Sequence, residues 1–177
     1  MSRRLADGIG APPAPADRPA VQAVVALGAN QGDRRATFAA AVDELSRLPL
    51  TTDVRVAEPI ESVAITLEGA DADAPAYLNS VAVMTTRLAP SVLLGYLHAI
   101  EARHGRERTV RWGDRTLDLD LIVYGDARSD DPRLLLPHPR AAERDFVLAP
   151  WLALDPDAVL PGAGRVDELL ARLGSDS

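Results

Sequence analysis

Two aspartates stand two residues apart in an otherwise apolar segment, Leu117-Asp118-Leu119-Asp120-Leu121. This alternation is the period-2 pattern of a β-strand, so both carboxylates project from one face and the leucines from the other. Residues i and i+2 of a strand lie about 6.6 Å apart at the backbone. Carboxylates at that spacing can converge on two hard cations about 3.5 to 4 Å apart, the arrangement of two-metal phosphoryl-transfer sites.

The residues after the aspartates indicate where the pair lies. Ile122 and Tyr124 follow on the face that carries Asp118 and Asp120. We therefore expect the strand to enter a core covered on both sides just beyond the second aspartate. Asp is depleted in strands, so the presence of two of them needs an explanation. The alternative explanation is a structural strand whose two charges are simply solvated at an edge.

An arginine-rich segment precedes the acidic strand. Arg111, Trp112 and Arg115 supply planar cations for phosphate oxygens and an aromatic face for a heterocycle. The segment 106–116 has little apolar content, so we expect a mobile loop over the site. With no cysteine in the chain, a metal must bind carboxylates, His or water, which favours magnesium or manganese over zinc. These residues together predict a site for phosphate and a divalent metal.

Composition excludes several classes of protein. The net charge of -7 over 177 residues argues against general nucleic-acid binding, which needs a basic face. No apolar run reaches the roughly 20 residues of a membrane span, and the N-terminus lacks the apolar core of a signal peptide. We therefore expect a cytoplasmic protein that acts on a small molecule. Residues 1–20 hold four prolines and predict a disordered lead-in, and 21–177 are expected to form a single domain.

The other segments alternate between strand and helix patterns. An apolar run at 21–27 stops at a glycine-containing turn, and Asp33 can cap a helix over 34–48. Strand patterns follow at 51–57 and 78–88, separated by a loop-like stretch at 58–76, and Pro90 opens a helix that ends at Gly105. The order strand, helix, strand, strand, helix, strand predicts an α+β fold, a ferredoxin-like sandwich with helices packed on an antiparallel sheet. Beyond it we expect a short apolar strand at 134–136, a helix within 140–154 broken by Pro150, and a last helix at 166–173.

The run Arg-Trp-Gly-Asp-Arg-Thr-Leu-Asp-Leu-Asp at 111–120, with Pro-His-Pro-Arg at 137–140, resembles the signature of the 6-hydroxymethyl-7,8-dihydropterin pyrophosphokinases of folate biosynthesis. The known fold of that family is also ferredoxin-like. The resemblance implies a monomeric enzyme that uses ATP and a reduced pterin as substrates and two Mg²⁺ ions. It spans about residues 21–173.

The resemblance also implies roles for individual residues. Asp118 and Asp120 match the two magnesium ligands and, with Arg115 and Arg106, form the expected catalytic group. Tyr77, Asn79, Trp112 and Phe146 match pterin-binding positions; an Asn amide carries both a donor and an acceptor for the edge of such a ring. The expected ATP-binding residues are Glu101, Arg108, Arg111, Trp112, Arg115, His138 and Arg144.

One segment departs from the family pattern. The loop before Tyr77 usually carries Tyr-x-Thr-x-Pro and glycines, whereas residues 56–60 here read Val-Ala-Glu-Pro-Ile and the loop is longer and acidic. Three alternatives to the pyrophosphokinase therefore stay open. They are a non-catalytic ferredoxin-like module that binds a nucleotide, a degenerate paralogue with an altered pterin loop, and a metal-dependent nucleotidyl transferase that releases pyrophosphate.

Overall fold

The computed structural model describes residues 17–62, 64–66, 69–71, 76–105 and 116–175. Six elements in chain order build the main layer: β1 (Val21–Ala29), α1 (Arg34–Ser46), β2 (Thr51–Val56), β6 (Tyr77–Thr86), α2 (Pro90–Arg103) and β7 (Asp118–Tyr124). Their strands form an antiparallel sheet in the order β2-β6-β1-β7. This order is the one expected for a ferredoxin-like fold, and it confirms the predicted class.

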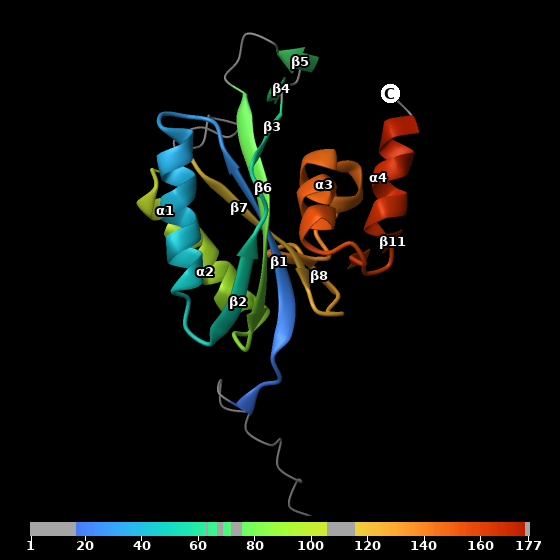
Figure 1. The fold of residues 1–177 in the computed structure, drawn as a ribbon. Coiled ribbons are helices and arrows are strands. Elements are labelled where there is room, and N and C mark those ends of the chain that lie inside the picture. Colours follow the sequence, from blue (N-terminus) through green and yellow to red (C-terminus); the bar gives the residue numbers. More distant parts are fainter. Residues whose placement is uncertain (1–16, 63, 67–68, 72–75, 106–115, 176–177) are drawn as a thin grey trace, which may run out of the picture.

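Local sequence signals explain where the two main helices begin and end. The Asp33 carboxylate caps α1 by accepting a hydrogen bond from the Ala36 N–H at 3.0 Å, as the sequence predicts. Pro90 is the first residue of α2, and Gly105, with φ of 86°, follows its last turn. The two helices lie on the same face of the sheet, as Figure 1 shows. Their apolar side chains pack there against the odd-numbered residues of β1, such as Val25.

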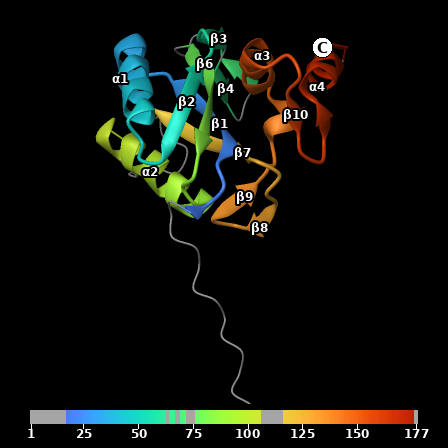
Figure 2. The same cartoon turned by 60° about the horizontal axis from the view of Figure 1, so that its bottom comes forward.

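The opposite face of the sheet is covered by the C-terminal part of the chain. That part comprises β8 (Ser129–Asp131), β9 (Leu134–Leu136), η2 (Ala141–Glu143), α3 (Asp145–Leu154), β10 (Val159–Leu160), β11 (Gly164–Arg165) and α4 (Val166–Ser175). α3 packs against β6 and against α4, and Figures 1 and 2 show both helices on the side of the sheet away from α1 and α2. Trp151 of α3 is buried in this second core. The sheet is therefore buried on both faces over most of its length.

Two sequence expectations about this half of the chain are wrong in detail. α3 is not broken at Pro150; the helix continues through it to Leu154. Proline removes only one backbone donor there, and Pro150 itself is buried. Tyr124 does not share the face of Asp118 and Asp120. Ile122 is an extra residue in a β-bulge opposite β1, so Tyr124 packs with the α1–α2 core instead.

The stretch 58–76 contains more structure than the expected loop. β3 (Ile60–Ser62) pairs with the beginning of β6, on the edge that β2 follows further along. β4 (Ala64–Thr66) and β5 (Gly69–Asp71) form a separate two-stranded pair. Period-2 alternation cannot reveal a strand of three residues, because its pairing is decided by the neighbouring strand.

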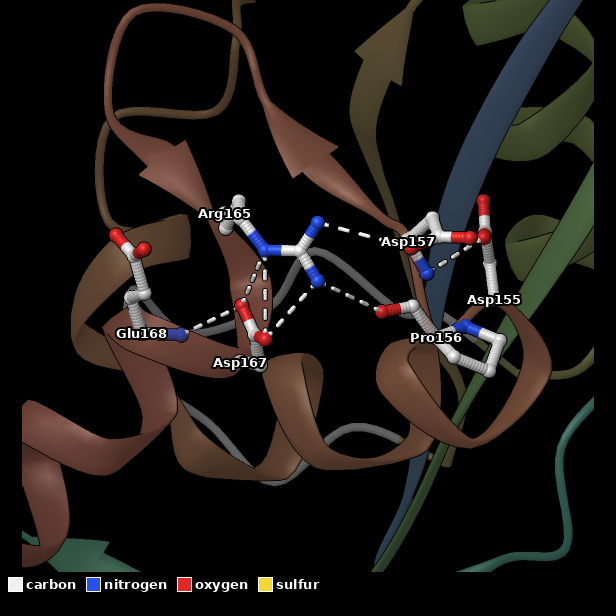
Figure 3. Close-up of polar contacts among 6 residues, drawn as sticks. All are labelled: Asp155, Pro156, Asp157, Arg165, Asp167 and Glu168. Carbon is white, nitrogen blue, oxygen red and sulfur yellow. Dashed lines mark hydrogen bonds and ion pairs between the residues drawn. The ribbon is translucent and has the colours of Figure 1, made fainter.

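An ion-pair network fixes the start of α4. The Arg165 guanidinium contacts the Asp167 carboxylate at 3.0 Å and the Asp157 carboxylate at 3.6 Å, as Figure 3 shows. Arg165 holds the pKa of the Asp167 carboxyl below its usual range. These groups are on the surface, so their role is to orient the β10–β11 turn and not to supply much stability.

Among the described residues, no helix has the length and apolar character needed to cross a membrane.

A second ion pair joins α1 to the end of α2. Glu44 accepts hydrogen bonds from Arg103 Nε at 2.6 Å and from His104 Nε2 at 2.8 Å. Partial burial raises the pKa of Glu44, but the two hydrogen bonds outweigh it, so its pKa lies below the ordinary value. The two contacts tie the end of α2 to α1.

Replacing Glu44 with Gln tests this link. A carboxyl whose pKa is lowered by folding stabilises the protein above the pKa of the unfolded chain and loses that effect as pH falls through the folded value. We expect Glu44→Gln to lower the free energy of unfolding at pH 7 by about 0.5 to 1 kcal/mol, with a smaller difference near pH 4, measured by urea denaturation. Asp43→Asn is the control, because Asp43 forms a local ion pair with Arg47, the residue after α1, and both side chains are exposed. Equal losses in the two variants would contradict the link.

Candidate active site

The candidate site is built across three neighbouring strands around Gly28. In the register of the sheet, Gly28 of β1 stands opposite Asn79 of β6 on one side and opposite Asp118 of β7 on the other. Directly opposed residues of antiparallel strands project from the same face. The Asn79 and Asp118 side chains therefore share a face, and two interstrand spacings place their backbones about 10 Å apart.

The two predicted metal ligands lie where the second core stops. Asp118 and Asp120 are partly exposed, whereas Ile122, next on the same face, is completely buried. The predicted position at the mouth of a core is thus confirmed, and the alternative of a fully solvated edge is not. Asp120 stands opposite Ala26, one step closer to the core than the Gly28 row.

A pocket runs along the outer edge of β7, beside the two aspartates. Three elements line it: α2, the acidic part of β7, and the β8–β9 hairpin together with the residues that follow it. The lining residues are Leu94, His98 and Glu101 of α2, residues 118–121, residues 132–135, His138 and Pro139. The lining therefore combines both carboxylates with apolar residues of α2 and of the hairpin.

Arg144 joins the C-terminal half of the chain to the acidic strand. It precedes α3, and its Nη1 donates a hydrogen bond to Asp120 Oδ2 at 3.1 Å. Its guanidinium also lies 5.8 Å from the centre of the Phe146 ring. Arg144 is only one-fifth exposed, so this cation is placed close to the carboxylate before any ligand arrives. The expected grouping of Arg144 and Phe146 near the aspartates is consistent with these contacts.

His138 is held by one hydrogen bond of its backbone and one of its ring. Its backbone N–H donates to the Ile122 carbonyl at 2.8 Å, and its ring Nδ1 accepts from the Arg140 backbone N–H at 3.2 Å. Burial lowers the pKa of His138, and the nearby Asp120 carboxylate opposes that shift only in part. The neutral ring is favoured, and because Nδ1 is an acceptor, its proton is on Nε2.

Glu101 is buried, contrary to what a position near the end of a surface helix suggests. Only 1% of it is exposed, and its Oε1 accepts a hydrogen bond from the Leu119 N–H at 2.9 Å. This bond ties α2 to the edge strand between the two aspartates. Glu101 thus helps to set the position of β7 as well as lining the pocket.

The predicted pterin-binding residues lie on the other side of Gly28. Asn79 is buried and Tyr77, at the start of β6, is partly exposed. Phe146 comes from α3, which packs against both β6 and β3. Topology therefore places these three side chains on elements that meet, on the face that also carries Asp118.

Five predicted site residues lie outside the described part of the chain: Arg106, Arg108, Arg111, Trp112 and Arg115. The residues that flank this segment are described, and they come close together. A Cβ added to Gly105 would lie 3.4 Å from Thr116 Oγ1. Both ends of the segment therefore start beside the pocket residue Glu101 and the acidic strand.

Sequence reasoning missed several residues that the structure brings to the site. Arg133 lines the pocket and pairs with Asp131 within the β8–β9 hairpin, and His98 of α2 lines it too. Asn30, two residues after Gly28, is buried, and its side-chain oxygen has no hydrogen-bond partner among the described residues. The Pro132-Arg133 turn ahead of three leucines is a sequence signal that could have identified the hairpin.

The donor set suits a magnesium site completed by a ligand. Among the described residues, no three His, Asp or Glu side chains converge on one point as a metal group. Asp118 and Asp120 alone supply two carboxylates on one face of β7. Mg²⁺ is typically held by one or two carboxylates together with substrate phosphates and water, so the residues fit.

The fold and the site together define a class of protein: an α+β sandwich with an acidic pocket of the kind that binds metal-complexed phosphates. The model of the 7,8-dihydro-6-hydroxymethylpterin-pyrophosphokinase family matches residues 24–156. The chain belongs to this family.

Known relatives agree with the family match. A 2-amino-4-hydroxy-6-hydroxymethyldihydropteridine pyrophosphokinase of Pseudomonas aeruginosa is 44% identical over 147 residues, which are 83% of this chain and 88% of the relative. The enzyme of the same name from Haemophilus influenzae is 36% identical over 85% of this chain and 91% of its own length. The crystal structure of Plasmodium falciparum HPPK-DHPS A437G covers 90% of this chain with a TM-score of 0.67, although this chain matches only 46% of it. At 11% identity that likeness concerns the fold alone.

Two replacements of His138 test the proton assigned to Nε2. A glutamine amide can place an N–H near the position of Nε2, whereas alanine cannot. We expect His138→Ala to raise the KM for ATP about tenfold at pH 8 and His138→Gln to raise it no more than about threefold, measured by steady-state kinetics. Equal increases in the two variants would contradict a role for the Nε2 proton.

Proposed function

We propose that the chain transfers the pyrophosphoryl group of ATP to 6-hydroxymethyl-7,8-dihydropterin, giving the pterin diphosphate and AMP in folate biosynthesis. The observation that carries this conclusion is membership of the family over residues 24–156, with relatives of that name matched along nearly their whole length. The protein is thus an ATP-dependent diphosphokinase.

ATP is assigned to the pocket along β7. Its phosphates would lie beside Asp118 and Asp120, where Arg144 and the Nε2 proton of His138 are available to phosphate oxygens. The nucleoside would extend toward α2 and the β8–β9 hairpin, past Glu101 and the apolar residues of β9. The cations of segment 106–115, namely Arg106, Arg108, Arg111 and Arg115 with Trp112, are proposed to complete the phosphate site.

The pterin is assigned to the face around Gly28. Asn79 would read the donor and acceptor edge of the ring, and Tyr77 and Phe146, with Trp112, would supply aromatic contacts. This arrangement puts the two substrates on either side of Asp118. The reacting groups would then meet between the residues paired with Gly28 and those paired with Ala26 in the sheet.

Two Mg²⁺ ions are proposed at Asp118 and Asp120. When bound there, the metal supplies charge neutralisation for the phosphates and lowers the pKa of the attacking hydroxyl. The chain's own residues hold the acceptor and ATP in line, and Arg144 balances charge on the transferred group. The pterin hydroxymethyl oxygen forms a bond to the β-phosphorus as the bond from that phosphorus to the α-phosphate oxygen breaks. The hydroxyl proton is released and AMP leaves, with no covalent intermediate on the enzyme.

A monomer is the proposed active form. Its need for ATP supports a cytoplasmic location.

Replacing Asp120 with Ala tests the assignment. Asp120 is about one-third exposed, so the variant should fold with nearly unchanged melting temperature. We expect turnover to fall about a thousandfold, equivalent to about 4 kcal/mol of lost transition-state stabilisation, measured as AMP released from ATP, Mg²⁺ and the reduced pterin.

Asp126→Ala is the matched control, since Asp126 is exposed in the turn at the far end of β7. It should keep wild-type turnover. AMP release by the Asp120→Ala variant near the wild-type rate would refute the role of Asp120. Pyrophosphate in place of AMP from the wild type would indicate a nucleotidyl transferase, and ATP binding without either product would indicate a binding module.

A further inference from the structure

The segment that departs from the family pattern contains strand β3, which pairs with a strand of the candidate site. β3 runs antiparallel to β6, with Ile60 opposite Asn79 and Ser62 opposite Tyr77. Arg34 Nη2 of α1 donates a hydrogen bond to Glu61 Oε1 of the same strand at 3.4 Å. β3 is therefore attached to β6 by its backbone and to α1 by a side chain, although it has only three residues.

Ser62 makes a direct contact with the side chain assigned to the pterin. Asn79 Nδ2 donates a hydrogen bond to Ser62 Oγ at 2.6 Å. The contact is diagonal across the β3–β6 pair, within the reach of cross-strand side chains. Asn79 is only 6% exposed, so a hydrogen bond there is poorly replaced by solvent.

The other end of the Asn79 amide is directed toward Gly28. A Cβ at Gly28 would lie 3.2 Å from Asn79 Oδ1, tighter than an ordinary van der Waals contact. Because glycine has no Cβ, position 28 leaves room for Asn79 Oδ1. Gly28 stands opposite Asp118 on its other side. The amide nitrogen is held on the β3 side and the amide oxygen lies on the β1 side.

This arrangement determines which groups Asn79 presents. A carboxamide has two N–H donors and one oxygen acceptor, and turning it over exchanges donor and acceptor. With one N–H given to Ser62, the second N–H and Oδ1 face away from β3. The edge of an amino-oxo heterocycle carries an oxo acceptor beside a ring N–H donor, so a reversed amide would oppose like groups at that pair.

We propose that Ser62 is a positioning residue for the pterin, holding the Asn79 amide in the orientation that matches the heterocycle edge. The inference rests on the proposed role of Asn79 in pterin binding. It assigns to the Ser62 side chain of strand β3 a part in substrate recognition. Ser62→Ala should therefore weaken pterin binding without affecting ATP.

The experiment compares Ser62→Ala with Ser80→Ala. Ser80 is the neighbour of Asn79 on β6, is buried, and donates its hydroxyl to the Ala57 carbonyl at 2.7 Å. We expect Ser62→Ala to raise the dissociation constant for the reduced pterin, measured by calorimetry, about five- to tenfold. The KM for ATP should stay within twofold. Ser80→Ala should lower the melting temperature but leave pterin affinity within twofold of the wild type. Ser62→Thr keeps the hydroxyl and should keep pterin affinity near that of the wild type.

A second readout follows the amide itself. In ¹⁵N spectra the Asn79 side-chain protons should exchange with water faster in Ser62→Ala than in Ser80→Ala, whether or not pterin is present. Wild-type pterin affinity in Ser62→Ala, or equal losses in both variants, would overturn the inference while leaving the enzyme assignment intact. A wild-type protein that neither binds the pterin nor releases AMP would overturn the proposed function and, with it, this inference.

Discussion

The antiparallel pairing of β1 with both of its neighbours is the constraint on which the site depends. Because β6 and β7 each run opposite to β1, the residues facing Gly28 from the two sides must share one face of the sheet. Asn79 and Asp118 are those residues. A shift of either register by one residue would send one of them to the α1–α2 core. The register therefore brings the amide proposed to bind the pterin and the carboxylate proposed to bind the metal together without any loop.

The two cores explain why the site is open at this point. α1 and α2 cover one face of the sheet, whereas α3 and α4 cover the other only as far as Ile122. Beyond that residue Asp120 and Asp118 are partly exposed, and Arg144, at the start of α3, is placed at the boundary. The charged residues thus lie next to a rigid packed layer, which limits the reorganisation needed when phosphates bind.

The sequence predicts the elements that have a period and misses those that depend on partners. The βαββαβ order, the Asp33 cap and the acidic strand are all visible as local patterns. β3 is not, because Ile60-Glu61-Ser62 becomes a strand only through its pairing with β6. The bulge at Ile122 is a property of the β1–β7 register and is not visible in the sequence, so Tyr124 was predicted on the wrong face of the strand. The bonds of Ser62 and Glu44 join residues far apart in sequence, and no spacing reveals them.

A crystal structure with Mn²⁺, α,β-methylene-ATP and the pterin substrate would test the central claim most directly. The account predicts two anomalous peaks, each within metal-ligand distance of Asp118 or Asp120 and of the triphosphate, with the pterin against Asn79. Carboxylates of Asp118 and Asp120 that bind no metal in that complex, or a triphosphate bound away from β7, would contradict it.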